Sequence, residues 1–227
     1  MITSVRKTSI LSLATVLLCL TQTDGMAQTP HGWRGPDRNG TYYETGLLKE
    51  WPAGGPEQLW ETLDAGKGYS SPVIVNGKLY LTGMNEDETQ EIFSAYTLDG
   101  KKIYETIYGS PWKDTYPETR TTPAIEGNRA YVISGAGEVV CLNIENGEII
   151  WKVDGEATFG KQTGTWGTSE CPLVFDNKVI YTPGGEQTTM VALHTETGET
   201  VWQSPCLGDK SAYVSPLLIN HNGKNKL

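Results

Sequence analysis

The stretch ALHTETGETVW, from Ala192 to Trp202, decides the fold, because the chain carries two further copies of it. They are CLNIENGEIIW, from Cys141 to Trp151, and AYTLDGKKIY, from Ala95 to Tyr104. Each copy has a short apolar run, a polar turn with a glycine, and an aromatic residue at the fourth position after that glycine. Two β-rich runs joined by a turn that accepts positive φ predict a β-hairpin. We therefore interpret each copy as the closing hairpin of a repeated unit.

A second hairpin signal, which begins at a proline, precedes each copy. These opening stretches are SPVIVNGKLY from Ser71, TPAIEGNRAY from Thr122, CPLVFDNKVIY from Cys171 and SPLLINHNG from Ser215. They recur about every 45–50 residues, which is the length of one blade in a β-propeller. Two hairpins per unit predict an all-β fold, a β-propeller of four-stranded antiparallel blades. No segment from residue 28 onward shows sustained helical periodicity, in agreement with this fold class.

The repeats divide the chain into an N-terminal extension at residues 28–56 and a partial propeller at residues 57–227. Within the propeller we expect a closing strand at 57–63, blades at 68–108, 119–154 and 166–204, and the start of a further blade at 211–227. The segment 57–63 lacks its own first three strands, so we expect it to complete the last blade of a closed ring and to leave no open sheet edge. About three and a half blades cannot close a ring. We therefore expect an incomplete ring, from a longer protein or a fragment of one.

The first 27 residues have the features of a secretory signal peptide. Arg6 and Lys7 form a basic start, Ile10 to Leu20 is a short apolar stretch, and small residues precede the cleavage site that we expect after Ala27. The apolar stretch is shorter than the ~20 residues that a transmembrane helix needs. We therefore predict a periplasmic or extracellular protein.

Composition argues against several classes of function. The net charge is −9, so the surface repels phosphate backbones, and no nucleic-acid partner is predicted. No segment of the mature chain is apolar enough for a membrane-spanning helix. Cys141, Cys171 and Cys206 lack a CxxC motif, and we expect free cysteines that behave as small apolar residues, with one disulfide as the alternative. His and Cys are not at zinc-ligand spacing, so no metal site is predicted.

The repeats resemble those of a known family of propellers. Ala192 to Trp202 is similar to the tryptophan-docking repeat of the pyrroloquinoline quinone (PQQ) family; the other copies are weaker matches, with Asn146 in place of Thr and Tyr104 in place of Trp. The stretch GWRGPDRNG, from Gly32 to Gly40, resembles the start of exported PQQ-binding-like β-propeller repeat proteins. The resemblance covers nearly the whole mature chain. It implies a ring that usually has eight blades.

The family divides by function, and the fold alone does not choose between its branches. Quinoprotein alcohol or sugar dehydrogenases hold the quinone and a calcium ion, whereas BamB-like members are scaffolds without catalysis. The quinone is typically held between a Trp and a disulfide of adjacent cysteines; this sequence has no Cys-Cys pair and no residue set that matches the calcium ligands. We therefore predict a binding or scaffolding module without its own catalysis and without a cofactor. The alternative is a PQQ- and calcium-dependent dehydrogenase whose remaining site residues lie beyond residue 227.

Four aromatic residues share one position in the repeat, at the end of a closing strand. They are Trp60, Tyr104, Trp151 and Trp202. One hypothesis is that they stack on a cofactor. We favour packing between blades, because large rings are buried well between twisted sheets.

The candidate ligand site follows from propeller geometry. The innermost strand of each blade begins near the central axis, so residues just before it line the mouth of the channel. Three residues before the repeat prolines stand Tyr69, Arg120, Ser169 and Tyr213, and Trp166 lies close upstream of the third proline. Side chains that converge from several blades predict a site for another protein or a small ligand, in which Arg120 could bind a carboxylate or phosphate through two hydrogen bonds. The alternative is that these side chains only fill and solvate the channel mouth.

Overall fold

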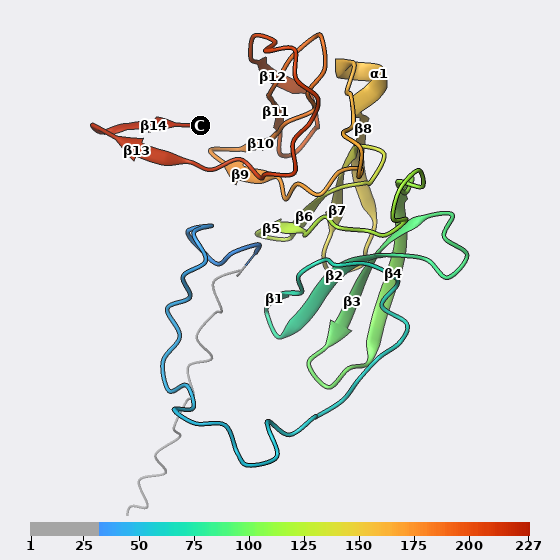
Figure 1. The fold of residues 1–227 in the computed structure, drawn as a ribbon, viewed down its shortest axis with the longest axis vertical. Helices are drawn as coiled ribbons and strands as arrows, with labels where there is room; N and C mark the ends of the chain where they lie inside the picture. The colour runs from blue at the N-terminus through green and yellow to red at the C-terminus, as the bar shows by residue number, and fades with distance from the viewer. Residues whose placement is uncertain (1–31) are drawn as a thin grey trace, which may run out of the picture.

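The computed structural model describes residues 32–227. The predicted signal peptide at residues 1–27, its cleavage site and the first residues of the extension lie outside the described residues. Nearly all of the regular structure is β, and it forms three four-stranded sheets and one separate hairpin (Figure 1). The predicted fold class, all-β with four-stranded antiparallel blades, is therefore confirmed.

Each sheet is one blade, in which four consecutive strands pair antiparallel in chain order. The first blade contains β1 (Val73–Val75), β2 (Lys78–Met84), β3 (Glu91–Thr97) and β4 (Lys102–Gly109). The second contains β5 (Ala124–Glu126), β6 (Arg129–Ile133), β7 (Glu138–Asn143) and β8 (Ile149–Asp154). The third contains β9 (Leu173–Phe175), β10 (Lys178–Tyr181), β11 (Val191–His194) and β12 (Thr200–Gln203). A hairpin of β13 (Ile219–His221) and β14 (Lys224–Lys226) follows.

The segment 57–63, predicted as a closing strand, is not a strand in the structure. A strand needs the hydrogen bonds of a neighbour, and within residues 32–227 no strand pairs with this segment. Its indole nevertheless contacts the first blade, because Trp60 Nε1 donates a hydrogen bond to Leu98 O at 2.8 Å. The three blades and the hairpin of the described residues form an incomplete ring.

A short helix, α1 (Gly155–Phe159), follows β8, and the sequence analysis did not predict it. The carboxylate of Asp154 caps its start by accepting hydrogen bonds from Glu156 N and Ala157 N, both at 3.0 Å. Gly160 ends it with a φ of 61°. A helix of five residues is too short to show a helical period in the sequence. Among residues 32–227, no helix has the length and apolar character that crossing a membrane requires.

The aromatic residue of a closing strand lies on the turn glycine of the following blade. The ring–glycine pairs are Trp60 with Gly100, Tyr104 with Gly147, and Trp151 with Gly198, where a Cβ on the glycine would lie 2.6, 2.6 and 2.8 Å from the ring. Each ring also donates a hydrogen bond to a carbonyl beside that turn, at 2.8 Å to Leu98 O, 2.8 Å to Ile144 O and 3.0 Å to Thr195 O. Two features favour glycine at each of these positions: the backbone φ is positive, and the ring leaves no space for a Cβ.

The fourth aromatic residue, Trp202, has a different environment. Its ring packs on the cluster of Leu173, Ile180 and Ala192 in the third blade. Leu218, which precedes β13, packs on the same cluster.

The hydrophobic core lies between neighbouring blades. Phe93 and Tyr108 of the first blade share a buried cluster with Val140 of the second. Trp151 of the second blade shares another cluster with Tyr181 of the third. A blade therefore buries its faces only when its neighbours are present, and the stability of the chain depends on the junctions.

We predict that Gly198→Ala destabilises the protein more than Gly77→Ala. The two glycines have nearly the same positive φ, 73° and 70°, so the backbone strain of the substitutions is matched. At Gly198 the added methyl group meets the ring of Trp151, whereas nothing lies within 4 Å of a Cβ at Gly77. We expect an additional loss of about 1–3 kcal/mol in the free energy of unfolding, measured by urea denaturation. Equal losses for the two variants would contradict the importance of this contact.

Candidate functional site

Three loops gather at one end of the blades, each before an innermost strand. We call residues 110–120, 160–169 and 204–214 the mouth loops. Hydrogen bonds connect them in order along the chain, since Thr115 Oγ1 donates to Thr165 O and Ser211 N donates to Gln162 O at 2.9 Å. The mouth loops therefore form one continuous surface, although they come from different repeats.

An aromatic pair stands at the centre of this surface. The rings of Trp166 and Tyr213 lie 5.5 Å apart between centroids, with 49° between their planes. Trp166 N donates a hydrogen bond to the Tyr213 hydroxyl at 3.1 Å, so the two loops hold the pair in place. Trp166 is 49% exposed and Tyr213 is 41% exposed. The pair is thus connected by a hydrogen bond between the two loops and is open to solvent.

Arg120 supports this pair through its guanidinium group. Its Nη1 donates to Trp166 O at 3.0 Å and to Glu118 O at 3.3 Å, and its Nη2 donates to Tyr116 O at 2.5 Å. An ion pair of 3.6 Å with the Glu118 carboxylate completes its surroundings. The sequence analysis proposed that Arg120 binds an external anion. In the structure its donors are used by the protein itself, so its observed role is to join two mouth loops.

The two remaining predicted residues lie beside this centre. Tyr69 N donates to Thr119 O at 2.8 Å, which attaches the segment before the first blade to the first mouth loop; the ring of Tyr69 is 74% exposed. Ser169 is half-buried in the second mouth loop. The structure thus links Arg120 to Trp166 and Trp166 to Tyr213, and it bonds the backbone of Tyr69 to Thr119, the neighbour of Arg120 in the chain.

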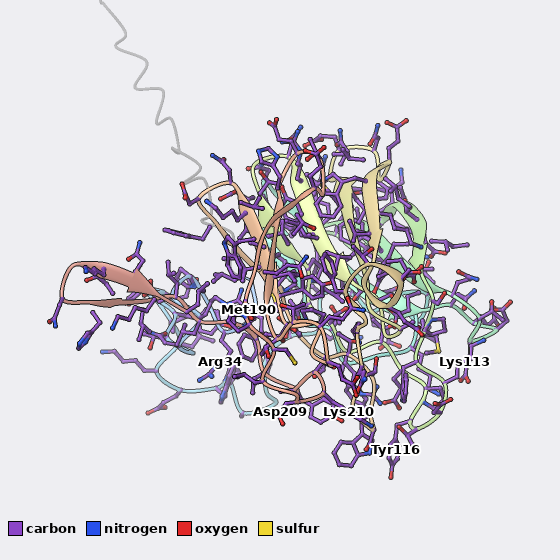
Figure 2. The ribbon with its side chains drawn as sticks, turned by 90° about the horizontal axis from the view of Figure 1, so that it is seen from above. Arg34, Lys113, Tyr116, Met190, Asp209 and Lys210 are labelled. Atoms are coloured by element: carbon purple, nitrogen blue, oxygen red, sulfur yellow. The ribbon has the colours of Figure 1, made fainter. Side chains whose placement is uncertain are left out.

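One exposed aromatic residue at this end, Tyr116, was not predicted. It is 68% exposed and projects from the first mouth loop, at the same end of the molecule as Asp209 and Lys210 (Figure 2). Tyr116 stands four positions before Arg120, out of phase with the repeat prolines, so the repeat pattern did not reveal it. A search for any aromatic residue among the polar residues of the loop would have found it.

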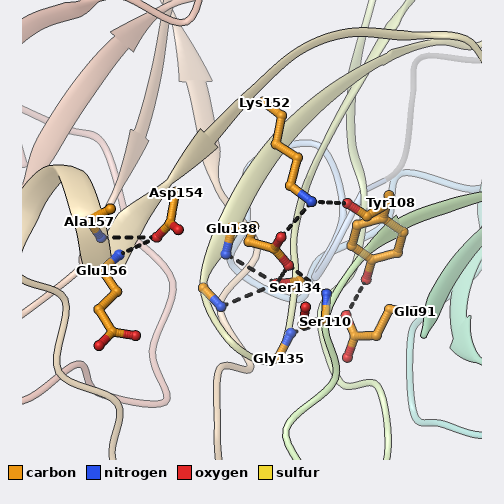
Figure 3. A network of polar contacts seen from close by, with 11 residues as sticks. Glu91, Tyr108, Ser110, Ser134, Gly135, Glu138, Lys152, Asp154, Glu156 and Ala157 are labelled. Carbon is orange, nitrogen blue, oxygen red and sulfur yellow. Dashed lines mark hydrogen bonds and ion pairs between the residues drawn. The ribbon is translucent and has the colours of Figure 1, made fainter. Parts of the chain in front are cut away.

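A buried polar network lies at the junction of the first and second blades, beside the first mouth loop (Figure 3). The Glu91 carboxyl group is fully buried and accepts hydrogen bonds from the Tyr108 hydroxyl at 2.6 Å and from Gly135 N at 3.1 Å. Burial, with a smaller contribution from the charge of Glu138, outweighs the lowering effect of the hydrogen bonds and raises the pKa of Glu91 to about 7. Glu91 therefore exchanges its proton near neutral pH.

The pKa of the neighbouring Glu138 carboxyl group is lowered, in contrast to that of Glu91. Partial burial by itself would raise its pKa, but the ion pair with Lys152 and hydrogen bonds from Ser110 N at 2.5 Å and Ser134 Oγ at 2.9 Å lower it. Glu138 is therefore ionised where Glu91 is still protonated. The two groups lie in one network (Figure 3), and the difference keeps two negative charges from meeting at the junction.

Among the described residues the structure contains neither a cluster of acidic, His or Cys side chains that could bind a metal ion nor a disulfide. Within residues 32–227, no group of three or more His, Cys, Asp or Glu side chains could hold a metal ion. Cys141, Cys171 and Cys206 are free thiols, so this part of the chain offers no disulfide on which a quinone could stack. Glu91 Oε2 and both carboxyl oxygens of Glu170 accept hydrogen bonds from protein donors.

Comparison with known proteins identifies one family. Residues 94–218 match the family described as outer membrane protein assembly factor BamB. The match covers more than half of the 227 residues and includes the second and third blades. No curated protein matches the sequence.

Several solved structures are similar to parts of this chain. A europium-containing methanol dehydrogenase aligns with 64% of this chain and 26% of its own length, at 15% identity and a TM-score of 0.46. A quinohemoprotein alcohol dehydrogenase from Comamonas testosteroni aligns with 62% and 21%, at 25% identity and a TM-score of 0.47. BamB from Moraxella catarrhalis aligns with 63% and 37%, at 18% identity and a TM-score of 0.41. The chain thus spans between 21% and 37% of the length of these proteins.

We predict that Glu91→Gln removes a loss of stability that the protein shows as the pH rises from 4.5 to about 7. The folded-state pKa of Glu91 lies above the ordinary value of 4.5, so the folded state holds an additional proton in this range. The stability that the proton contributes is complete below pH 4.5 and is lost as the pH rises through about 7. Gln keeps an acceptor for Tyr108 and does not titrate. Above pH 7 the variant should therefore be more stable by up to about 3 kcal/mol.

Urea denaturation across this pH range measures the effect. Glu138→Gln is the contrasting variant. Because the pKa of Glu138 is lowered in the folded state, the stability that its charge contributes is lost as the pH falls. The variant should therefore lose less stability than the wild type at acid pH. If the free energy of unfolding of the Glu91→Gln variant depended on pH as strongly as that of the wild type, Glu91 would not be the group that titrates in this range.

Proposed function

Because the chain belongs to the family described as outer membrane protein assembly factor BamB, we propose that it is an exported β-propeller that acts as a binding or scaffolding module without catalysis of its own. The family match confirms the resemblance to PQQ-like repeat propellers. A family named for the assembly of other proteins supports a protein as the partner. We propose that the partner binds at the mouth loops.

The observation that carries this proposal is the fixed, exposed pair of Trp166 and Tyr213. Trp, Tyr and Arg are the residues that most often dominate the energy of a protein–protein interface. The backbone of Trp166 is held by Arg120 and donates to the Tyr213 hydroxyl, and the two rings pack on each other, so part of the ordering entropy is already lost before binding. Tyr69 and Tyr116 extend the same surface with further exposed rings.

The shape of the surface favours a protein over a small molecule. A small ligand needs a concave site that buries most of its surface. The pockets of about 700 Å³ and 390 Å³ are lined by residues other than the exposed aromatic residues of the mouth loops. Those aromatic residues stand out from the loops, as an interface with a second macromolecule requires.

Export is part of the proposal. The predicted signal peptide at residues 1–27 and the family description, which refers to the outer membrane, both support a periplasmic or extracellular protein. The net charge of −9 supports a partner other than nucleic acid.

We predict that a photo-crosslinking residue at Tyr116, in the full-length protein in its native cells, captures a discrete partner protein. The same residue placed at Ile150, which is 42% exposed on β8 away from the mouth loops, is the matched control and should not capture it. With the purified partner, Trp166→Ala should weaken binding by about 2 kcal/mol, or roughly thirtyfold. Equal capture at both positions, or full affinity of the Trp166→Ala variant, would exclude the mouth loops as the interface.

The dehydrogenase alternative has its own test. PQQ and calcium are added to the full-length protein, and binding is followed by calorimetry together with dye-linked oxidation of alcohols. We expect no saturable binding and no oxidation, because the described residues do not supply the ligands. Tight binding accompanied by oxidation would replace the scaffold proposal with the enzyme.

A further inference from the structure

The loop Gly32 to Gly40 lies against the innermost strands β5 and β9, and we call it the strap. Two successive turns fold it, with Gly35 N donating to Gly32 O and Arg38 N donating to Gly35 O, both at 3.1 Å, and Gly40 N closes the loop by donating to Arg34 O at 2.9 Å. Figure 1 shows the blue start of the described chain beside β5. The strap and the two strands enclose a pocket of about 390 Å³.

Arg38 anchors the strap to the third blade. Its Nη2 donates to Cys171 O at 2.6 Å, and its Nη1 donates to Pro172 O at 3.0 Å. The two carbonyls precede β9 directly, and the planar fork of the guanidinium reaches both at once. Arg38 has a φ of 53°, which residues with a side chain rarely adopt, so the contact holds the backbone in a disfavoured conformation.

Trp33 forms the second contact of the strap. Its ring lies 5.4 Å from the Arg34 guanidinium carbon and 5.7 Å from that of Arg38, so it is flanked by two cations. It also lines the pocket, together with Ile125 of β5 and Leu173 of β9. The strap therefore covers apolar side chains of two blades.

The chain further along, at residues 45–54, adds no buried side chain that would hold the strap on the blades. These residues are exposed throughout, and Leu47, Leu48 and Trp51 are each about 70% exposed. A segment with few buried apolar contacts opens at low cost without disturbing the sheets. The strap is thus held mainly by Arg38 and Trp33.

We propose that the carbonyl groups of Cys171 and Pro172 form a guanidinium-binding site, that Arg38 fills this site from within the chain, and that the strap opens as a unit to admit an arginine-bearing segment of a partner. The residues of this site lie outside the mouth loops, so the inference stands apart from the proposed function. The opened strap exposes the inner wall of two blades, at β5 and β9.

Cys171 provides a direct report of the opening. Its side chain is 1% exposed, and Arg38 Nη1 lies 3.8 Å from its sulfur. Cys141 is equally buried, but in the second blade between its neighbours, away from the strap. Cys206 is exposed. The three thiols therefore give a reporter, a negative control and a positive control in one chain.

The experiment measures maleimide labelling of each cysteine in the full-length protein by peptide mass spectrometry. In the wild type we expect rapid labelling of Cys206 and slow labelling of Cys171 and Cys141. Arg38→Gln should accelerate labelling of Cys171 on the order of tenfold or more, with Cys141 unchanged. Arg38→Lys, which keeps the charge but loses the fork, should give a smaller increase.

The ligand class is tested with a synthetic peptide of residues 32–40. Added to the Arg38→Gln protein, it should bind the vacated carbonyls and slow the labelling of Cys171 again. The same peptide with the Arg38→Gln change should give no protection. A binding site for guanidinium predicts this difference, because only the arginine peptide can donate to both carbonyls.

Three results would overturn the proposal. An unchanged labelling rate of Cys171 in Arg38→Gln would mean that Arg38 does not hold the strap. Parallel acceleration of Cys141 and Cys171 would mean that the loop belongs to the global fold and does not open by itself. Equal protection by the two peptides would mean that the carbonyls do not select a guanidinium group.

Discussion

The contact between an aromatic ring and the turn glycine of the next blade is the constraint on which the rest of the structure depends. The ring donates to a carbonyl beside the turn, and its face fills the space that a Cβ would occupy, as for Trp151 on Gly198. The contact fixes the angle and distance between two sheets at their outer ends. Once these are set, the large side chains of adjacent blades meet in a shared core, and the loops before the innermost strands converge at one end.

Buried polar groups lie at the same junctions, but their burial costs free energy, whereas the burial of apolar groups stabilises the fold. Taking the Glu91 carboxyl out of water is costly, and the cost is limited by protonation and by the Tyr108 and Gly135 hydrogen bonds. Glu138, which keeps its charge, is paired with Lys152. The junction of the first two blades is therefore stabilised by apolar packing and adjusted by proton uptake. This makes the contact between the first two blades sensitive to pH near neutrality.

The two proposed binding regions use different physical means. At the mouth loops, the rings of Trp166 and Tyr213 are exposed, and the proposed partner would cover them. At the inner strands, the site is already covered by a segment of the same chain, held by one guanidinium group and one indole. The first region gains affinity because its side chains are pre-ordered, whereas the second must first release an internal occupant, which lowers the apparent affinity of any competitor.

The local repeats of the sequence were sufficient to predict the strands and their pairing within each blade, because every strand pairs with its neighbour in the chain and every turn has its own glycine or asparagine. The shared phase of Trp60, Tyr104 and Trp151 also predicted a common packing role, and in the structure each ring contacts the turn glycine of the blade that follows it in the chain. The helix α1 was missed because a helix of five residues has no period, and the segment 57–63 is not a strand because a strand depends on a partner elsewhere. Only the tertiary structure decided what the arginines do. Arg120 meets carbonyls from two loops, and Arg38 reaches carbonyls more than 130 residues away in the chain. Hydrogen-bond partners of long side chains are chosen by distance in space, and the spacing of residues along the sequence carries no record of that distance.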